Sequence, residues 1–335
     1  MARYDFASDN VAGAMPEVIE ALGRFNTGFE ASYGADSVSA RARDLIRQLL
    51  DVDAEIWFTA SGTAANALTL AAMAQPHEAV VGHRYSHIAT DETGAPGFFG
   101  AGLGVIGLGG ASGRIDAIEL SAVLAGEDNP HAQSPAALSV TQATEFGALY
   151  TQKALAGLIA SAKAKGLKIH LDGARLANAV AAGFDPLAIK RLGVDVVVLG
   201  GTKAGATPTE AIVLIDRTLG RRFGARLKHG GQLTSKSRFL AAPWIGMLET
   251  DAWSIRAGHA NAMARRLAAA MPFPINHAVE ANGVFVEMDE GALGRLQAAG
   301  WFVYRFIDGS VRFMCSWATT PEVVDDLAET LRRIA

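Results

Sequence analysis

Short runs of β-branched and apolar residues alternate along most of the chain with longer alanine- and leucine-rich segments. The short runs predict β-strands, and the longer segments predict helices that connect them. The expected strands cover residues 55–58, 79–82, 104–108, 137–141, 168–171, 194–199 and 211–215, and expected helices include 63–74, 152–165 and 187–192. This alternation predicts an α/β fold with a mostly parallel sheet of seven strands. The strand that contains Val196–Leu199 is expected near the centre of the sheet, because its residues are apolar on both faces.

The rhythm changes after about residue 243. A long alanine-rich helix over 252–271 leads into strands at 284–288, 302–306 and 311–316, and a last helix covers 321–333. This order predicts a compact α+β unit. The first forty residues have no strong period, and we expect them to form an arm that packs on another part of the protein. The predicted organisation is an arm over 1–40, a large α/β domain over 41–245 and a small domain over 246–335.

The composition excludes several classes of function. A formal net charge of −4 fits neither a polybasic nucleic-acid surface nor a disordered acidic tail. The expected partners are therefore a small molecule and a further copy of the chain. Cys315 stands alone in the sequence, so no internal disulfide can form, and its apolar neighbours predict a buried thiol. With no apolar run at the start of the chain and no span of ~20 apolar residues, we expect a cytoplasmic protein.

One glycine-rich segment imitates a dinucleotide-binding motif. The segment 102–107 has the spacing G-x-G-x-x-G, but it is neither preceded by a strand nor followed by a helix. A nucleotide-binding loop needs both, because the pyrophosphate sits on the helix N-terminus. We therefore interpret these glycines as the path of the chain into and out of a short strand.

Three other segments carry candidate chemistry. Ser61, Gly62 and Thr63 stand between an expected strand and a helix, where free N–H groups and hydroxyls bind phosphate, although an ordinary helix N-cap is the commoner use of such residues. Asp172 and Arg175 follow another strand; they suit either a ligand crevice or a local ion pair equally well. Lys203 follows the most apolar strand after two glycines, which permit close approach of a ligand, and desolvation there favours the neutral amine needed for Schiff-base chemistry.

The order of these segments is more specific than any one of them. Thr63 precedes Asp172 by 109 residues, and Lys203 follows Asp172 by 31. Phosphate loop, aspartate and lysine in this order resemble the fold-type I pyridoxal-phosphate enzymes, the fold of aspartate aminotransferase. Nearly the whole chain is similar to the L-threonine aldolases of the aromatic amino acid β-eliminating lyase and threonine aldolase group. The most specific matching segments are 6–10, 61–66, 86–92, 171–175, 200–203 and 311–314.

The resemblance implies a set of site residues. Lys203 is the expected Schiff-base lysine, Asp172 the partner of the pyridine nitrogen, and His87 a residue over the cofactor ring. The expected ligands of pyridoxal 5'-phosphate are Ser61, Gly62, Thr63, His87, Asp172, Arg175, Lys203 and Lys228, and the expected substrate ligands are Ser8, Tyr33, Arg175 and Arg312, with no metal among them. Tyr33 and Lys228 are expected to reach the cofactor of a neighbouring subunit. The resemblance therefore also implies a homodimer or homotetramer with shared active sites.

The implied activity is retro-aldol cleavage of L-threonine, L-allo-threonine and related β-hydroxy-α-amino acids to glycine and an aldehyde. A β-eliminating amino acid lyase of the tyrosine or tryptophan type is the alternative, and a non-catalytic pyridoxal-binding protein is a third reading. The intact carboxylate-binding arginines argue against the third reading, since a pure binder needs none.

The sequence departs from the family at one position. Many threonine aldolases have a second histidine after the strand that ends near residue 141, and Thr144 is expected to stand in its place. A small residue there predicts weak discrimination between the two epimers at Cβ. It also leaves open which group takes the β-hydroxyl proton: His87, Asp91 or an ordered water.

Overall fold

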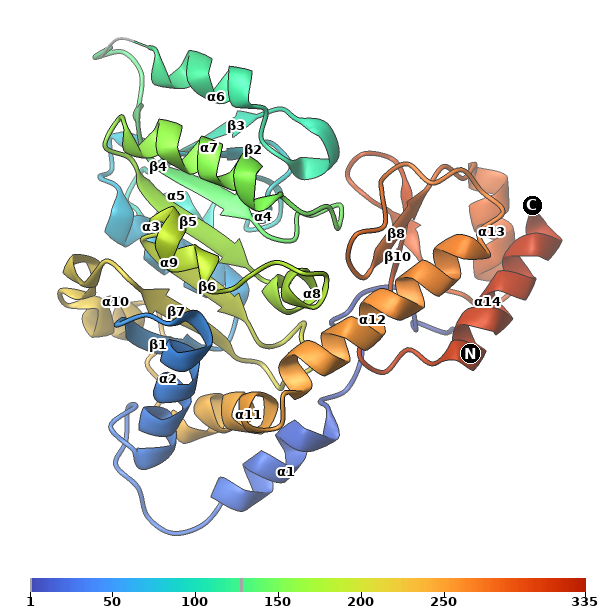
Figure 1. Cartoon of the computed structure of the whole chain (residues 1–335), viewed down its shortest axis with the longest axis horizontal. Helices are drawn as coiled ribbons and strands as arrows, with labels where there is room; N and C mark the ends of the chain where they lie inside the picture. Colours follow the sequence, from blue (N-terminus) through green and yellow to red (C-terminus); the bar gives the residue numbers. More distant parts are fainter. Residues whose placement is uncertain (1, 127–128) are drawn as a thin grey trace.

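The structure, a computed structural model, describes residues 2–126 and 129–335. A seven-stranded sheet forms the middle of the larger part of the molecule, with strand order β1-β7-β6-β5-β4-β2-β3 (Figure 1). The strands are β1 (Glu55–Thr59), β2 (Glu78–His83), β3 (Gly104–Leu108), β4 (Ser134–Thr141), β5 (Lys168–Gly173), β6 (Val196–Gly200) and β7 (Glu210–Leu214). Strands β6, β5, β4, β2 and β3 are parallel, and β7 runs antiparallel to both β6 and β1. The predicted fold class and all seven strands are confirmed.

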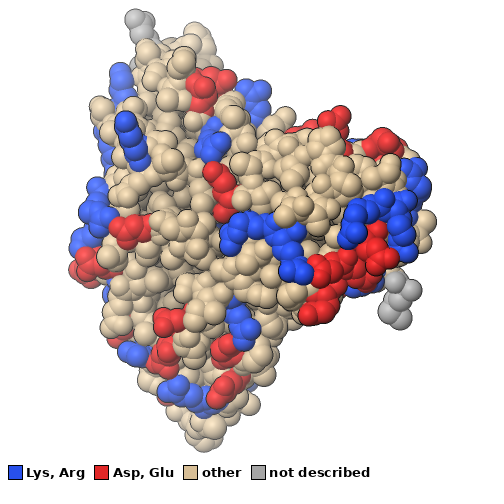
Figure 2. Space-filling model, turned by 45° about the vertical axis from the view of Figure 1, so that its right-hand side comes forward, with Lys and Arg blue, Asp and Glu red and all other residues tan. Residues whose placement is uncertain are grey.

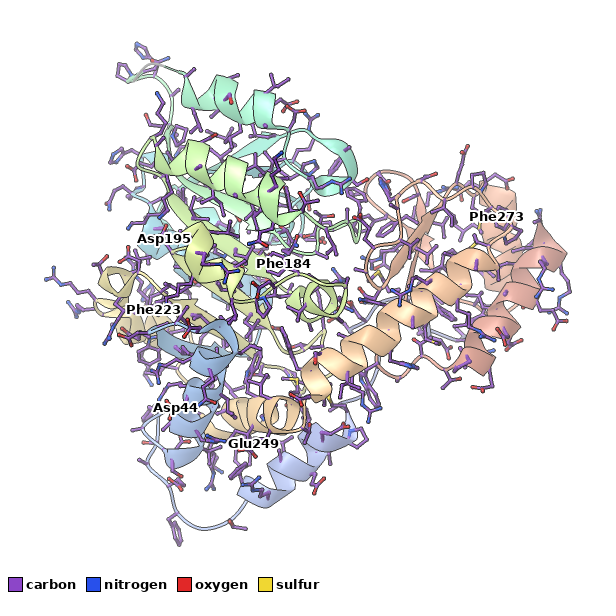
Figure 3. All side chains as sticks on the ribbon, viewed as in Figure 1. Asp44, Phe184, Asp195, Phe223, Glu249 and Phe273 are labelled. Atoms are coloured by element: carbon purple, nitrogen blue, oxygen red, sulfur yellow. The ribbon has the colours of Figure 1, made fainter. Side chains whose placement is uncertain are left out.

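Strand β6 is buried along its whole length, as its apolar sequence predicts. Alternate residues of this strand face two separate cores. Val197 packs in one core with helices α7 (Gln152–Lys163), α9 (Ala188–Leu192) and α2 (Ser37–Leu50), and Val198 packs in the other with α3 (Gly62–Met73) and α10 (Phe223–His229). Figure 3 labels one member of each core, Phe184 of the first and Phe223 of the second. The sheet is therefore covered by helices on both faces.

The glycine-rich segment 102–107 forms the entry to edge strand β3 and most of that strand. A short 3-10 helix, η1 (Ala111–Gly113), comes next, followed by α6 (Ala117–Leu124), with no helix starting directly at the glycines. The structural interpretation of these glycines is confirmed. Between β2 and β3 lie two short helices, α4 (His87–Thr90) and α5 (Ala95–Phe99).

The C-terminal part has its own three-stranded sheet, in the order β8 (Gly283–Val286), β10 (Val311–Met314) and β9 (Tyr304–Arg305). Helices α13 (Glu290–Ala298) and α14 (Pro321–Ile334) pack with this sheet around a separate core, which Phe273, labelled in Figure 3, also contacts. Helix α12 (Ala252–Ala269) crosses between the two parts, because Trp253 at its start belongs to the first core and Leu267 near its end to the small one (Figure 1).

The N-terminal segment packs on its own chain. Helix α1 (Pro16–Phe25) lies against α11 (Arg238–Glu249), so closely that a Cβ on Gly246 would stand 2.4 Å from the carbonyl oxygen of Glu17. Phe6 is buried in the core of the C-terminal part, and α2 begins at Ser37, inside the expected arm. Most of the segment therefore packs on other parts of the same chain. Its exposed stretch is residues 27–33, where Phe29 is fully exposed.

The surface is mixed in charge, and Figure 2 shows Lys and Arg interspersed with Asp and Glu on the displayed face. Within residues 2–126 and 129–335, no helix is both long and apolar enough to cross a membrane. Cys315 is fully buried, as predicted, and burial raises the pKa of its thiol, so it is not poised as a nucleophile.

Candidate active site

A cavity of about 310 Å³ opens where the carboxyl ends of β5 and β6 meet the start of α3. This is the edge at which parallel α/β sheets place their ligands. The residues lining it are Asn10, Ala60, Ser61, Gly62, Thr63, Asn66, His87, Glu145, Asp172, Ala174, Val198, Thr202, Lys203, Pro208 and Glu210. The structure therefore brings together the three predicted segments that are far apart in the sequence.

The start of α3 forms one end of this cavity. Ser61 is the N-cap in extended conformation, and its Oγ accepts a hydrogen bond from the Ala64 amide at 3.3 Å. The N-cap interpretation is therefore confirmed, and phosphate binding stays a prediction, for which Gly62 and Thr63 line the cavity. A Cβ on Gly62 would meet no atom within 4 Å, so there is open space in front of the first turn. Open space at the N-terminus of a twelve-residue helix suits a phosphate.

Asp172 lies at the end of β5, in the floor of the cavity, and is only 3% exposed. Its two carboxylate oxygens accept hydrogen bonds from Asn66 Nδ2 at 3.0 Å and from the Ala174 amide at 3.0 Å. These bonds hold the carboxylate in one orientation while leaving it on the cavity surface. Such a fixed, buried anion matches the group that stabilises a protonated ring nitrogen.

Asn66 continues this network to His87. Its Nδ2 also donates to Glu92 Oε1 at 2.8 Å, and His87 Nδ1 lies 2.8 Å from the same oxygen. Burial alone lowers the pKa of His87, but the Glu92 hydrogen bond and the negative charge of Glu145 outweigh it, so the pKa of His87 is raised. The imidazole is therefore a donor held in place by a buried carboxylate rather than a free base.

Lys203 follows β6 and lines the same cavity. Within the described residues its Nζ makes no hydrogen bond or ion pair. The two preceding glycines have a different role from the one expected. A Cβ on Gly200 would stand 2.3 Å from the Ala174 carbonyl oxygen, and one on Gly201 would stand 2.5 Å from that of Thr209. The glycines therefore permit close approach of the chain's own backbone, not of a ligand.

A second cavity of about 380 Å³ adjoins the first. Ser8 and Arg312 line it, together with Tyr304 and Phe306 of the C-terminal part, and the Arg312 guanidinium carbon lies 4.7 Å from the centre of the Phe306 ring. Arg312 donates through Nη2 to the Tyr304 hydroxyl and to the Ala7 carbonyl, while its buried Nε has no partner among the described residues. This half-satisfied cation fits a carboxylate ligand.

Arg175 lies deeper than Arg312. It is 6% exposed, and its Nε and Nη2 donate to the two oxygens of Asp9 at 2.7 and 2.9 Å. Neither cavity is lined by it. One edge of the Arg175 guanidinium is thus occupied by Asp9. Direct contact of Arg175 with cofactor or substrate stays a prediction.

We expect removal of one partner of the buried Asp9–Arg175 pair to destabilise the fold strongly. Burial raises the pKa of Asp9, but the charge and hydrogen bonds of Arg175 outweigh it and lower the pKa to about 2. Asp9→Ala should therefore lower the free energy of unfolding by about 3–5 kcal/mol, because it leaves Arg175 charged and unpaired in the core. A lowered pKa stabilises the fold above the unfolded value, so the contribution should be lost as the pH falls from about 4 towards 2. Denaturant unfolding of both proteins tests this, and equal stability of Asp9→Ala and the parent at pH 7 would contradict it.

Thr144 does not face either cavity. It is buried, its hydroxyl donates to the Ser112 carbonyl at 2.7 Å, and the same oxygen accepts from the Ala148 amide at 3.1 Å. The expectation that Thr144 stands beside the substrate is therefore wrong. Its neighbour Glu145 lines both cavities instead.

Tyr33 and Lys228 lie away from both cavities but next to each other. Lys228 Nζ is 4.8 Å from the centre of the Tyr33 ring, and both side chains are exposed. Tyr33 has a φ of 58°, a backbone conformation that a bulky residue rarely adopts without a functional or packing reason. Within one chain this pair cannot reach the cavity, so any role at an active site requires a neighbouring subunit.

Several residues of the site were not predicted. Asp9, Asn66 and Glu92 lie inside the segments that match the family, but no role was predicted for them. The signal that could have found them was a polar side chain next to a run of residues expected to be buried. Glu210 begins a fully buried strand, and its Oε2 accepts from the Gly201 amide at 2.8 Å. Burial raises the pKa of Glu210 to about 7. A lone acid before four apolar residues was a signal that it serves the site.

Comparisons with solved structures identify the fold. A threonine aldolase from Leishmania major superimposes with a TM-score of 0.93 and 28% sequence identity, covering 99% of this chain and 100% of that one. An aspartate aminotransferase from Thermus thermophilus has a TM-score of 0.72 at 16% identity, covering 99% of this chain and 92% of that one, which shows the fold alone. The fold is that of the fold-type I pyridoxal-phosphate enzymes.

The sequence comparisons identify the family. The model of the family described as β-eliminating lyase matches residues 5–291. A low specificity L-threonine aldolase of Pseudomonas aeruginosa is 42% identical over 98% of this chain and 97% of its own length. Another from a Pseudomonas species is 40% identical with the same coverage. The chain belongs to the β-eliminating lyase family.

Proposed function

We propose that this protein binds pyridoxal 5'-phosphate and cleaves β-hydroxy-α-L-amino acids such as L-threonine and L-allo-threonine to glycine and an aldehyde. The observation that carries the proposal is Lys203, an unpaired amine at the junction of two cavities. One cavity has the helix terminus and buried carboxylate that suit the cofactor, and the other has the arginine that suits a substrate carboxylate. The threonine aldolases that match along nearly the whole chain support the same reaction.

The residues of the first cavity fit the cofactor. Ser61, Gly62 and Thr63 would hold the phosphate at the start of α3, Asp172 would hold the ring nitrogen, and His87 would lie against the ring. Lys203 would be the point of covalent attachment. When bound, the cofactor supplies an electron sink for the bond that breaks at Cα.

The residues of the second cavity orient the substrate. Arg312 binds the substrate carboxylate, and Ser8 donates a hydrogen bond to it. The positive charge of Arg175 adds to the electrostatic attraction for the same carboxylate. With nitrogen fixed near Lys203 and the carboxylate fixed at Arg312, one orientation is left, in which the Cα–Cβ bond can stand perpendicular to the ring. Inverting Cα would exchange this bond with the Cα–H bond, so the reaction should be strict for the L configuration.

The substrate panel that tests this proposal contains L-threonine, L-allo-threonine, L-phenylserine and D-threonine. We expect aldehyde from the three L compounds and none from D-threonine. Cleavage of D-threonine at a comparable rate would contradict the assigned carboxylate and amine positions. Release of a 2-oxo acid and ammonia would favour the alternative, a β-eliminating amino acid lyase.

We further propose that two subunits share each active site, in a homodimer or homotetramer. The exposed Tyr33–Lys228 pair and the fully exposed Phe29 on the same stretch support this arrangement. Mixing Lys203→Ala protein with Tyr33→Ala protein, each inactive alone, should create hybrid dimers with one intact site. Recovery should approach about a quarter of the parent activity after full subunit exchange in an equal mixture.

The matched control for this mixture is Lys203→Ala with the double variant Tyr33→Ala/Lys203→Ala, which forms no intact site. If the first mixture stays as inactive as this control while mass spectrometry shows exchanged subunits, the site belongs to one chain.

A further inference from the structure

We propose that Glu145 is the catalytic base that accepts the proton of the substrate β-hydroxyl. This inference rests on the proposed aldol cleavage and assigns the group that the sequence left open. It follows from the position of Glu145, from its free carboxylate oxygen and from the commitments of the neighbouring acids.

Glu145 stands at the junction of the two cavities. Four residues line both of them: Asn10, His87, Glu145 and Lys203. The bond that breaks must lie at this junction, because the substrate nitrogen belongs near Lys203 and its carboxylate near Arg312. Among the residues lining both cavities in the described part of the chain, Glu145 is the one carboxylate.

The loop after β4 fixes the backbone of Glu145. Thr144 before it bonds the Ser112 carbonyl, and Phe146 after it packs on Tyr85, His277, Phe285 and Phe306. Glu145 Oε1 accepts a hydrogen bond from the His87 amide at 3.3 Å. Its Oε2 has no hydrogen bond or ion pair with any described residue. One oxygen therefore anchors the side chain, and the other is available to a substrate.

The other acidic groups of the cavities are already in use or lie farther out. Asp172 accepts from Asn66 and Ala174 through its two oxygens, and neither Asp172 nor Glu210 lines the second cavity. Asp91 is exposed, and it lines the second cavity but not the first. Glu145 is thus the carboxylate that combines access to the junction with a free oxygen.

His87 is the remaining rival, and its surroundings oppose it as a base. Its Nδ1 is bound to the buried Glu92 at 2.8 Å, and the pKa of the imidazole is raised. A raised pKa increases the protonated fraction of the imidazole at a given pH, and only the unprotonated fraction can accept a proton. The charged groups that act on His87 are Glu92, Glu145, Lys203 and Asp172, and the three carboxylates outnumber the lysine.

The proton balance of the step is simple. The O–H bond at Cβ breaks, its proton passes to Glu145 Oε2, and the carbonyl of the aldehyde forms as the Cα–Cβ bond breaks. The electron pair of that bond stays with the glycine fragment, for which the cofactor, when bound, would supply the electron sink. A proton delivered to Cα then completes glycine, so no oxidant, reductant or further reactant is needed.

The test separates β-hydroxyl chemistry from chemistry at Cα. Aldehyde release from L-threonine needs a base at the hydroxyl, whereas exchange of the glycine α-hydrogen with D₂O does not. Glu145→Gln holoenzyme should lose about 10²–10⁴-fold in aldehyde release, the usual contribution of a general base. Its exchange rate with glycine, measured by NMR, should stay within about fivefold of the parent. Glu145→Asp should recover part of the cleavage, and formate added to Glu145→Ala should raise it.

Each contrary outcome has a distinct meaning. Equal loss of cleavage and exchange in Glu145→Gln would overturn the proposal and make Glu145 a positioning residue for His87. Asp91→Asn is the matched comparison, and a larger loss of cleavage in this variant than in Glu145→Gln would assign the base to Asp91. If the parent enzyme exchanges glycine but releases no aldehyde, the proposed function itself fails.

Discussion

Lys203→Ala is expected to reduce the cleavage of L-threonine on the order of 10⁶-fold, the scale seen when the nucleophile of a covalent catalyst is removed. Lys203 is the one lysine among the described residues that lines both cavities, and its side chain makes no hydrogen bond or ion pair with any of them. Alanine at this position cannot form the covalent link to the cofactor, so the proposed reaction cannot proceed through that link. The variant should still fold, because the lysine makes no hydrogen bond or ion pair within the described chain.

Borohydride reduction followed by peptide mapping measures the same assignment without turnover. The cofactor mass should appear on the peptide that contains Lys203 in the parent protein and should be absent in Lys203→Ala. Lys165→Ala is the control, since this lysine is exposed in the turn after α7 and lines neither cavity, and it should keep both the label and the activity. A label on another lysine in the parent protein would end the assignment.

Asp172→Asn should retain the cofactor but lose about 10²–10⁴-fold in turnover. Asparagine has nearly the same shape, but it brings no negative charge to a buried site, and unpairing a buried charge costs about 3–5 kcal/mol. Its amide group would also face the Nδ2 of Asn66, a donor that now bonds Asp172 at 3.0 Å. Both effects should make the cofactor a weaker electron sink, but neither should release the cofactor from the cavity.

The measurement is turnover beside cofactor content, determined from absorbance after extensive dialysis. Asp185→Asn serves as the control, because Asp185 is exposed and its bonds are to Arg191 and Leu187 on the surface. Near-normal turnover of Asp172→Asn with full cofactor content would contradict the role given to this carboxylate.

The sequence predicted the strands and the three site segments well, because both depend on local pattern. Asp172 and Lys203 each follow an apolar run, and neighbouring parallel strands end at one edge of a sheet. A residue at or just after the end of such a strand can therefore reach the crevice, as Asp172 and Lys203 do. The same reasoning explains why Ser61 and its neighbours lie opposite these two residues.

Long-range pairing was beyond the reach of pattern alone. Asp9 and Arg175 are 166 residues apart, and their contact depends on how the N-terminal segment returns across the C-terminal part. No pattern in the sequence names the partner of that segment, although α1 buries Val18 and Ala21 and packs on α11. The pairing partner of a lone charge is set by tertiary packing, which neither spacing nor composition encodes.

Thr144 and Glu145 are neighbours in one loop, and of the two only Glu145 lines the cavities. Adjacent residues in an irregular segment point in different directions, and no period tells which of them faces a ligand. The structure decides it through the hydroxyl of Thr144, which is fully used by Ser112 and Ala148. The weak Cβ discrimination expected from a small residue beside the substrate has therefore lost its original basis.

Product identity in the parent holoenzyme tests the central claim most directly. L-Threonine labelled with ¹³C, followed by NMR with pyridoxal 5'-phosphate supplied, should give glycine and acetaldehyde in equal amounts, matching the threonine consumed. Glycine and acetaldehyde appearing together is the predicted result. A 2-oxo acid with ammonia, or unchanged threonine beside a fully loaded cofactor site, would contradict it.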